Sequence, residues 1–298
     1  MKIGVVGYGE VGKIFAVGLK QTAESVCCWD IRFESVTDSE LQLMHAGQHQ
    51  VKVCASVAEL CAQSDLIISV VTASNALAVA EETARHLRPG SGFLDCNSAS
   101  PQTKQQSGKL IEAADGYFVE AGVMTSVPLY GLKVPMLLGG ARAGELARTL
   151  SDMGMHCSAV SNEVGVASAI KMCRSVMIKG LEALVIESFT TARSYGVEQQ
   201  MIATLYETFP SIDWEKQASY FYSRVAQHGK RRAEEMREVA NTISEAGFDP
   251  LMASAIAEKD DWMAQHTKAG LFDGITKEAD WQEFADRLTS LLPRKAKQ

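Results

Sequence analysis

The chain has 298 residues, a formal net charge of −7 and 46% hydrophobic residues, which is the composition of an ordinary globular protein. This composition excludes a disordered chain and a fibrous repeat, and the length suits two domains of roughly 100–200 residues each. Residues 1–161 carry 12 basic and 16 acidic side chains, and residues 162–298 carry 17 and 20. Neither half therefore offers the basic surface that a nucleic acid or an anionic membrane requires.

Seven cysteines, an odd number, are scattered along the chain without a CxxC pair or a zinc-finger spacing. This pattern predicts reduced thiols and no metal site. The apolar stretch 1–12 is short, rich in glycine and without a cleavage site, and it is far below the roughly 20 residues of a membrane span. We therefore expect a cytoplasmic protein with no membrane partner.

The first half of the chain alternates short β-branched runs with segments of helical periodicity, which predicts a doubly wound, mostly parallel sheet. The run 65–71 is almost entirely apolar, as in a strand that is covered on both faces. We expect strands at 2–7, 26–30, 51–54, 65–71, 92–97, 117–121, 134–139 and 156–160. We expect the intervening helices at 11–20, 57–63, 76–87, 101–113 and 144–153.

The pattern changes near Ser161. Residues 163–194 contain no proline, and a period close to 3.6 predicts one long helix with apolar residues at Ile170, Cys173, Met177, Leu181, Leu184 and Phe189. Further helices are expected to the end of the chain, with breaks at Pro210, Gly229, 247–250 and 270–274. The predicted fold is thus an α/β Rossmann-type domain over 1–161, followed by an all-α domain over 162–298.

The first expected strand runs directly into a GxGxxG turn that is followed by a helix, Gly7-Tyr8-Gly9-Glu10-Val11-Gly12. In this context the first glycine permits the tight turn, the second lets a pyrophosphate approach, and the third lets the helix pack on the strand. The start of the helix presents free N–H groups to the phosphates. The pattern predicts a nicotinamide dinucleotide site, and the alternative is a structural glycine turn without a nucleotide.

Asp30 ends the second expected strand, at the place of the acidic residue that binds a ribose 2′-hydroxyl. Its carboxylate would repel a 2′-phosphate and favours NAD over NADP, whereas Arg32 keeps NADP open because it can pair with such a phosphate. Small polar loops follow later strands and face the same crevice. From these loops, Val71, Thr72 and Asn97 are expected beside the nicotinamide end, or else they are turn residues.

Lys171, Arg174 and Ser175 stand at the start of the long expected helix, at i, i+3 and i+4. This spacing places them on one face of the helix, which Ile178 and Glu182 continue. The alternative interpretation of the three residues is a solvated polar stripe.

Three segments in this order resemble the β-hydroxyacid dehydrogenase superfamily, which includes 6-phosphogluconate and 3-hydroxyisobutyrate dehydrogenases. That family combines a GxGxxG turn with a DxPVSGG substrate motif and a glycine-led helix that carries KxxN. The corresponding segments here are 7–12, 120–126 (EAGVMTS) and 165–174 (GVASAIKMCR). The segment 228–236 (HGKRRAEEM) is similar to a branch of phosphogluconate-dehydrogenase-like proteins with its own carboxyl-terminal domain.

The resemblance implies that Lys171 is the general acid/base, which moves a proton to or from the substrate oxygen during hydride transfer. Arg174 would assist because a neighbouring cation lowers the pKa of a lysine. The family's substrate-binding Ser-Gly-Gly corresponds here to Met124, Thr125 and Ser126, so a small anionic or polar substrate is implied without its identity. Further substrate contacts are expected from Arg174, Ser175, His228, Arg231 and Arg232, the last three of which are alternatively core or solvated residues.

The sequence therefore predicts an NAD(P)-dependent oxidoreductase that acts on a small hydroxy acid or a related alcohol or carbonyl, with decarboxylation left open. An imine reductase-like enzyme is one alternative, although such enzymes usually carry another residue in place of Lys171. A non-catalytic dinucleotide-binding regulator is the other, and it would need neither Lys171 nor Arg174. The apolar face of the long helix exceeds its own domain and, with the resemblance, predicts a homodimer through the helical domain.

Overall fold

The computed structural model describes residues 1–35 and 39–291. The chain forms two compact units, Met1–Cys173 and Arg174–Gln298. We call these units the sheet unit and the helical unit. The division lies beyond Ser161, where the sequence pattern changes, because the backbone of residues 165–168 is hydrogen-bonded to the sheet.

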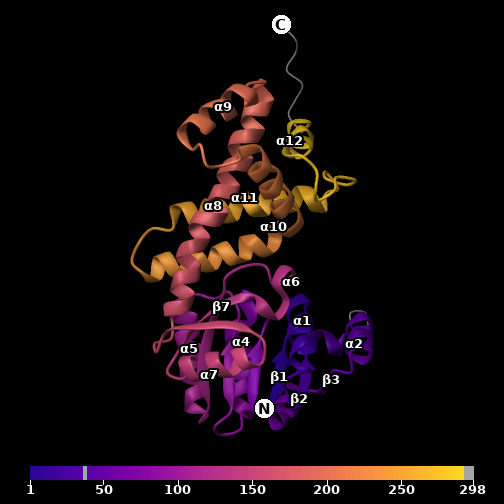
Figure 1. Ribbon diagram of the computed structural model, residues 1–298, viewed down its shortest axis with the longest axis vertical. Helices are drawn as coiled ribbons and strands as arrows, with labels where there is room; N and C mark the ends of the chain where they lie inside the picture. Colours follow the sequence, from indigo (N-terminus) through magenta and orange to yellow (C-terminus); the bar gives the residue numbers. More distant parts are fainter. Residues whose placement is uncertain (36–38, 292–298) are drawn as a thin grey trace. The chain divides into compact units, whose positions relative to one another are not determined.

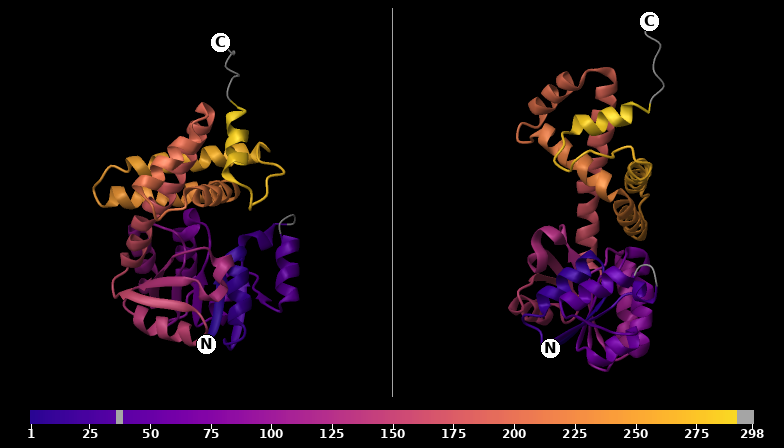
Figure 2. Two further views of the ribbon diagram at one scale, coloured as in Figure 1. Left: turned by 45° about the horizontal axis from the view of Figure 1, so that its top comes forward. Right: turned by 90° about the vertical axis from the view of Figure 1, so that its right-hand side faces the viewer.

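A single eight-stranded sheet forms the centre of the sheet unit, and Figure 2 shows helices on both of its faces. The order is β3-β2-β1-β4-β5-β6-β7-β8, and all neighbours pair in parallel except β6 and β7. The strands are β1 (Lys2–Val6), β2 (Ser25–Trp29), β3 (Lys52–Val53), β4 (Leu66–Ser69), β5 (Gly92–Asp95), β6 (Tyr117–Val123), β7 (Pro135–Gly139) and β8 (His156–Ser161). All four residues of β4 are buried, as expected of a strand covered on both faces. The predicted Rossmann-type sheet is confirmed.

The helices of the sheet unit follow the strands in alternation (Figure 1). They are α1 (Glu10–Leu19), α2 (Ser39–Gln48), α3 (Val57–Gln63), α4 (Ala76–His86), α5 (Pro101–Ala113), α6 (Val127–Tyr130) and α7 (Ala143–Asp152), with short 3₁₀ turns η1 (Ile31–Glu34), η2 (Ala73–Asn75) and η3 (Gly131–Lys133). The sequence did not predict α2. Only Ala46 of this helix is buried, so it has no apolar stripe from which a helical period could be read.

The helical unit contains most of α8 (Val166–Tyr195), together with α9 (Glu198–Thr208), α10 (Trp214–Glu245), α11 (Leu251–Lys268) and α12 (Trp281–Thr289). The predicted break at Gly229 is wrong, because α10 continues through it. A Cβ at this position would lie 2.7 Å from the backbone oxygen of Asp260, so the glycine lets α10 and α11 approach closely. Among the helices that the structure describes, none has both the length and the apolar composition of a membrane-spanning segment.

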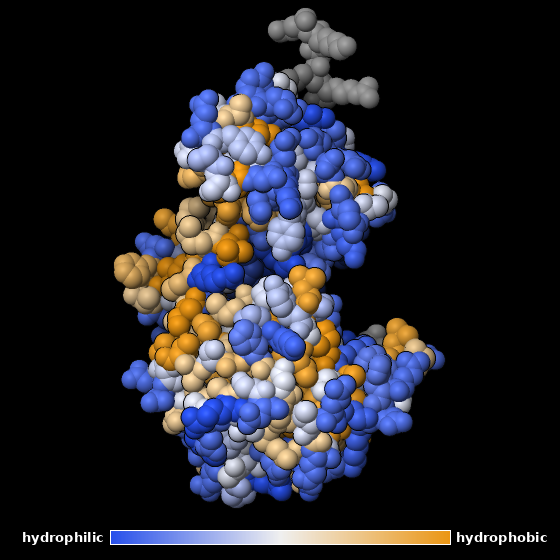
Figure 3. Space-filling model, viewed as in Figure 1, coloured by the Kyte–Doolittle hydropathy of each residue, from blue (hydrophilic) through white to orange (hydrophobic). Residues whose placement is uncertain are grey.

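The predicted long helix is present as α8, but its faces differ from the expectation. Most of the predicted apolar stripe is exposed: Met177 is 73% exposed and Leu184 is 56% exposed. Hydrophobic surface lies among polar surface along this helix in Figure 3. The buried face begins with the polar side chains of Ser175, Lys179 and Glu182 and continues with apolar ones. Val185, Ile186 and Phe189 belong to the core of the helical unit, whereas Ile178 is exposed.

Candidate functional site

The glycine turn lies where β1 runs into α1, beside the end of β4. Gly7 has a φ of +93°, in the left-handed region, and a Cβ there would lie 2.5 Å from the carbonyl oxygen of Val70. A Cβ at Gly12 would collide with the carbonyl of Gly7. Both positions therefore require glycine. At Gly9, by contrast, a Cβ would meet only Arg32 Nη2 at 3.7 Å, so the space beside this residue is open.

The amino-terminal end of α1 is suited to an anion. Gly9 is its N-cap residue, and no side chain of the described residues makes a capping hydrogen bond there. The N–H groups of Glu10, Val11 and Gly12 precede the first intrahelical donor, Lys13, whose N–H bonds to Gly9. These donors and the open space at Gly9 fit a pyrophosphate.

Asp30 and Arg32 meet at the carboxyl end of β2. Asp30 is 6% exposed, and its carboxylate accepts the Tyr8 N–H at 2.5 Å. Arg32 donates to the same carboxylate from its backbone N–H and Nε, each at 2.9 Å, and from Nη2 at 2.7 Å. Burial alone raises the pKa of Asp30, but hydrogen bonds from Arg32 and Tyr8 outweigh it and hold the pKa below its usual value. Asp30 is therefore ionised and already paired with a cation.

Tyr8 has a supporting position in the turn. Its side chain is fully buried, and its hydroxyl lies 3.1 Å from Nδ1 of His45 on α2. Its backbone N–H is the donor that fixes Asp30. Tyr8 therefore holds β1, the end of β2 and α2 together.

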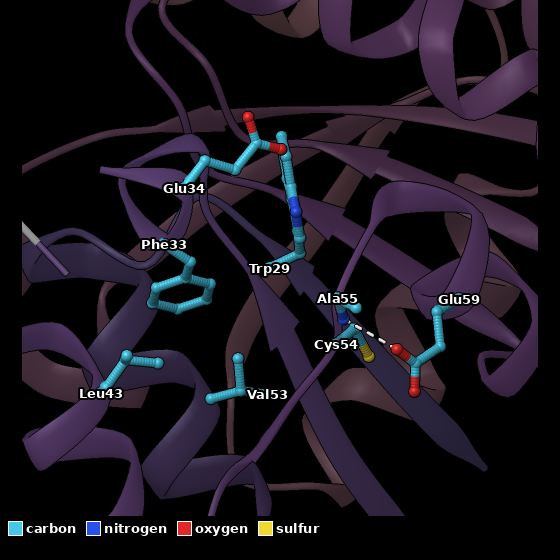
Figure 4. Close-up of a pocket in the computed structure, with 8 residues that line it drawn as sticks. All are labelled: Trp29, Phe33, Glu34, Leu43, Val53, Cys54, Ala55 and Glu59. Atoms are coloured by element: carbon cyan, nitrogen blue, oxygen red, sulfur yellow. Dashed lines mark hydrogen bonds between the residues drawn. The ribbon is translucent and has the colours of Figure 1, made fainter. Parts of the chain in front are cut away.

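A hollow of about 320 Å³ opens next to Asp30, past the carboxyl ends of β2 and β3. In Figure 4 the side chains of Phe33, Leu43 and Val53 point toward one another across it. The Ala55 N–H donates to Glu59 at 2.7 Å on the far side. The full lining is Trp29, Phe33, Glu34, Leu43, Val53, Cys54, Ala55 and Glu59. The lining combines apolar side chains with the carboxylates of Glu34 and Glu59, and the sequence indicated none of these residues individually.

Two loops at the ends of β4 and β5 are joined through Asn97. This residue is 4% exposed, and its Oδ1 accepts the Val71 N–H at 2.6 Å. Its Nδ2 donates to Ser69 Oγ at 2.9 Å and to Asp95 Oδ1 at 2.7 Å. Thr72 is exposed, and its hydroxyl accepts from Asn75 Nδ2 at 2.8 Å. The structure thus brings Val71 and Asn97 together, whereas Thr72 belongs to the following turn.

Glu120 of β6 caps α8 from inside the sheet unit. The residue is fully buried, and its carboxylate accepts the N–H groups of Gly165 at 2.7 Å, Ala167 at 2.9 Å and Ser168 at 3.3 Å. A carboxylate at a helix N-terminus satisfies unpaired N–H groups and matches the helix dipole. Glu120 therefore fixes the start of α8 against the sheet, a role that the sequence did not reveal.

This cap places Lys171 at the edge of the sheet that carries the glycine turn. Its Nζ donates to the hydroxyl of Ser98 at 2.6 Å, and both residues are half-buried. Ser98 lies in the loop that follows β5. Gly122 of β6 lets the start of α8 approach the strand closely, because a Cβ there would lie 3.0 Å from the Ala167 backbone oxygen. The sequence did not single out Ser98, although it indicated the polar loop that contains it.

The remaining predicted substrate residues near Lys171 differ in accessibility. Thr125 is exposed, and Met124 and Ser126 are partly exposed. The Met124 N–H donates to the Pro135 carbonyl at 2.9 Å, so the backbone of this segment is fixed by β7. On α8, Arg174 is exposed and Ser175 is 9% exposed.

The predicted substrate residues of α10 lie in the helical unit. Arg231 is exposed and pairs with Glu235 at 3.3 Å, and His228 is partly exposed. Arg232 is 4% exposed, its guanidinium contacts the Glu182 carboxylate, and burial lowers its pKa. Arg232 would therefore have to leave Glu182 to bind a ligand. The role of all three residues as substrate contacts stays a prediction.

Comparisons with known proteins agree with this geometry. The family described as the NAD binding domain of 6-phosphogluconate dehydrogenase matches residues 2–159, and a domain of unknown function, DUF1932, matches residues 192–263. A conserved hypothetical protein from Sinorhizobium meliloti is 36% identical, with a TM-score of 0.78 over 98% of this chain and 97% of its own. A conserved protein of unknown function that is structurally similar to 3-hydroxyacid dehydrogenases is 30% identical. Its TM-score is 0.71, and the match covers 90% of this chain and 98% of its own.

A likeness in fold extends to an enzyme of known activity. The 3-hydroxyisobutyrate dehydrogenase of Mycobacterium tuberculosis is 16% identical, with a TM-score of 0.72 over 89% of this chain and 94% of its own. At this identity the likeness concerns the fold alone. The family match therefore supports a nicotinamide dinucleotide, and it does not distinguish NAD from NADP.

Proposed function

Because the chain belongs to the β-hydroxyacid dehydrogenase superfamily, we propose that it is an NAD(P)-dependent oxidoreductase acting on a small hydroxy acid or a related alcohol or carbonyl. The observation that carries the proposal is the position of Lys171. Its ammonium group is held 2.6 Å from Ser98 at the sheet edge where the glycine turn and Asp30 lie. A dinucleotide-binding scaffold without chemistry would not require a lysine fixed at this place.

The dinucleotide would be held by the residues of the turn and by the end of β2. N–H groups at the start of α1 would bind the pyrophosphate, and the hollow beside Asp30 would take the adenine. The bound nicotinamide supplies or accepts the hydride. NAD is favoured, because the ionised Asp30 would repel a 2′-phosphate and already pairs with Arg32, the nearest cation. The bidentate pairing with Asp30 leaves Arg32 less able to bind that phosphate.

Lys171 would move the proton that accompanies the hydride. In the direction of reduction its ammonium group donates a proton to the carbonyl oxygen, and in oxidation the amine accepts the hydroxyl proton. Ser98 holds Nζ in place by accepting a hydrogen bond from it. On the sheet unit, the exposed Thr125 is the proposed partner of an anionic substrate group. Arg174, at the start of the helical unit, keeps its predicted role, since a guanidinium binds a carboxylate in a bidentate manner.

Binding and turnover test the proposal separately. NAD and NADP should each be titrated against the melting temperature, and NAD should raise it more. A panel of hydroxy acids, alcohols and imines should then be assayed by cofactor absorbance at 340 nm. With an active substrate, Lys171→Met should lower kcat by about 100- to 10,000-fold and leave the dinucleotide Kd unchanged. Full turnover by this variant would remove Lys171 from the chemistry, and binding without any turnover would favour a regulator.

The exposed stripe of α8 is the proposed homodimer surface. Met177, Leu181 and Leu184 stand four and three residues apart on one face, and all three are exposed in the single chain. A second copy of the chain would bury them, because exposed apolar stripes mark interaction sites. Sedimentation should give a dimer for the natural protein and a monomer for Met177→Glu. A natural protein that sediments as a monomer at micromolar concentration would contradict this surface.

A further inference from the structure

An ion pair is buried beneath the crevice loops. Lys104 of α5 and Asp95 at the end of β5 both have fully buried side chains. The Lys104 Nζ lies 2.9 Å from Asp95 Oδ1, and it also donates to the Asp95 backbone oxygen at 2.9 Å. Buried ion pairs are inefficient stabilisers, because the desolvation of two charges offsets most of their attraction. A stable core at this place would be made equally well by two apolar side chains.

The charges have a structural consequence beyond the pair itself. Asp95 Oδ1 also accepts the Asn97 N–H at 2.9 Å and Asn97 Nδ2 at 2.7 Å. A carboxylate can only accept hydrogen bonds, so it selects the orientation of the Asn97 amide with Nδ2 toward Asp95. The Asn97 oxygen consequently faces the neighbouring loop, where it accepts the Val71 N–H at 2.6 Å.

We propose that Asp95 and Lys104 are positioning residues for the dinucleotide. Acting through Asn97, they hold the loop after β4 and the loop after β5 in one fixed relation. Lys104 places its ammonium group 2.9 Å from Asp95 Oδ1, so the carboxylate is held between this cation and the Asn97 donors. In this proposal neither residue contacts the ligand itself. Ser98, which accepts the hydrogen bond from Lys171, directly follows Asn97 in the chain, so the same contacts also fix its backbone. The identification of the ligand as a dinucleotide rests on the proposed function, whereas the fixed arrangement of the two loops does not.

The test replaces the ion pair with apolar groups. The double variant Asp95→Leu/Lys104→Met has no buried charge, so it should remain folded, with a melting temperature lowered only by the loss of the acceptor for the Asn97 donors. Its Kd for NAD or NADP, measured by calorimetry, should rise about tenfold. In the protein without ligand, hydrogen exchange at the amide of Val71 should accelerate at least tenfold, because Asn97 has lost its anchor. Lys109→Met, on the exposed side of the same helix, is the matched control and should change neither quantity.

The outcomes separate this proposal from the proposed function. A folded double variant with unchanged Kd and unchanged exchange at Val71 would overturn the positioning role. If the natural protein binds neither dinucleotide, the proposed function fails, and exchange at Val71 still decides the role of the pair. If the double variant does not accumulate as folded protein, Asp95→Asn/Lys104→Met replaces it. This variant keeps the side-chain shape at position 95 and leaves no unpaired buried charge, and the same two measurements apply to it.

Discussion

Asp260 of α11 is a buried carboxyl that should make the stability of the helical unit depend on pH. Its side chain is fully buried, and neither carboxylate oxygen has a hydrogen-bond partner in the described part of the chain. Burial raises its pKa from 3.8 to about 7, although Arg232 and Lys179 act in the opposite direction. Glu235 of α10 and the neighbouring Asp261 add to the rise. We predict that Asp260→Asn stabilises the protein, and that the gain grows with pH.

The direction of this pH dependence follows from the number of protons that the folded and unfolded chains bind. The unfolded chain releases the Asp260 proton near pH 3.8, and the folded chain releases it near pH 7. The folded state therefore binds more protons between these two pH values. The free energy of unfolding therefore falls as the pH rises through this range. At about 1.4 kcal/mol per pH unit, the loss is about 4 kcal/mol above pH 7. The stability gap between Asp260→Asn and the natural protein should thus widen by about 3 kcal/mol from pH 5 to pH 8.

Urea unfolding followed by tryptophan fluorescence measures this gap. Three of the four tryptophans, Trp214, Trp262 and Trp281, belong to the helical unit, so the signal reports mainly on it. Asp249→Asn is the control, because Asp249 is exposed and the same substitution there should change stability by less than about 0.5 kcal/mol. A gap that stays constant between pH 5 and pH 8 would refute the reasoning, since it would mean that Asp260 does not titrate in this range.

Two further substitutions test the packing. Gly229→Ala should destabilise by about 1–3 kcal/mol in urea unfolding, because its Cβ would press on the α11 backbone; Gly47→Ala, which meets nothing within 4 Å, should not. A tolerated Gly229→Ala would mean that α10 and α11 separate easily. Glu120→Gln should cost about 1–3 kcal/mol in thermal unfolding and accelerate exchange at the amides of 165–168, since an amide accepts hydrogen bonds less strongly than a carboxylate. Unchanged exchange there would show that the cap does not hold α8.

Most of the fold could be predicted from patterns among neighbouring residues in the sequence. The strands of the sheet and the glycine turn were predictable, because short apolar runs and the Gly7, Gly9 and Gly12 spacing are properties of neighbouring residues. The prediction failed where a distant residue decides the structure. Gly229 was interpreted as a helix break, since glycine is a poor helix former, yet its reason is the backbone of α11.

In the candidate site, too, local motifs were predictable and contacts between distant residues were not. Lys171 was found through a motif, but its placement depends on Glu120, which precedes the helix it caps by 45 residues. The acceptor for its ammonium group, Ser98, is 73 residues away. No period or spacing links these positions, because only the pairing of β5 with β6 brings them to one edge. An acidic residue within the otherwise apolar strand 117–123 is the one signal that could have pointed to the cap.

The faces of α8 show why the same periodicity misled about burial. A 3.6 period identifies an apolar stripe without saying what covers it. In the single chain, Lys179 and Glu182 are buried because each finds an opposite charge on α10, in Glu235 and Arg232. These ion pairs and the buried Val185, Ile186 and Phe189 together form the inward side of α8. The stripe of Met177, Leu181 and Leu184 lies on the outward side and is exposed. Exposure of this apolar stripe to water is unfavourable. A second copy of the chain that packed on the stripe would remove it from water, at the cost of association entropy.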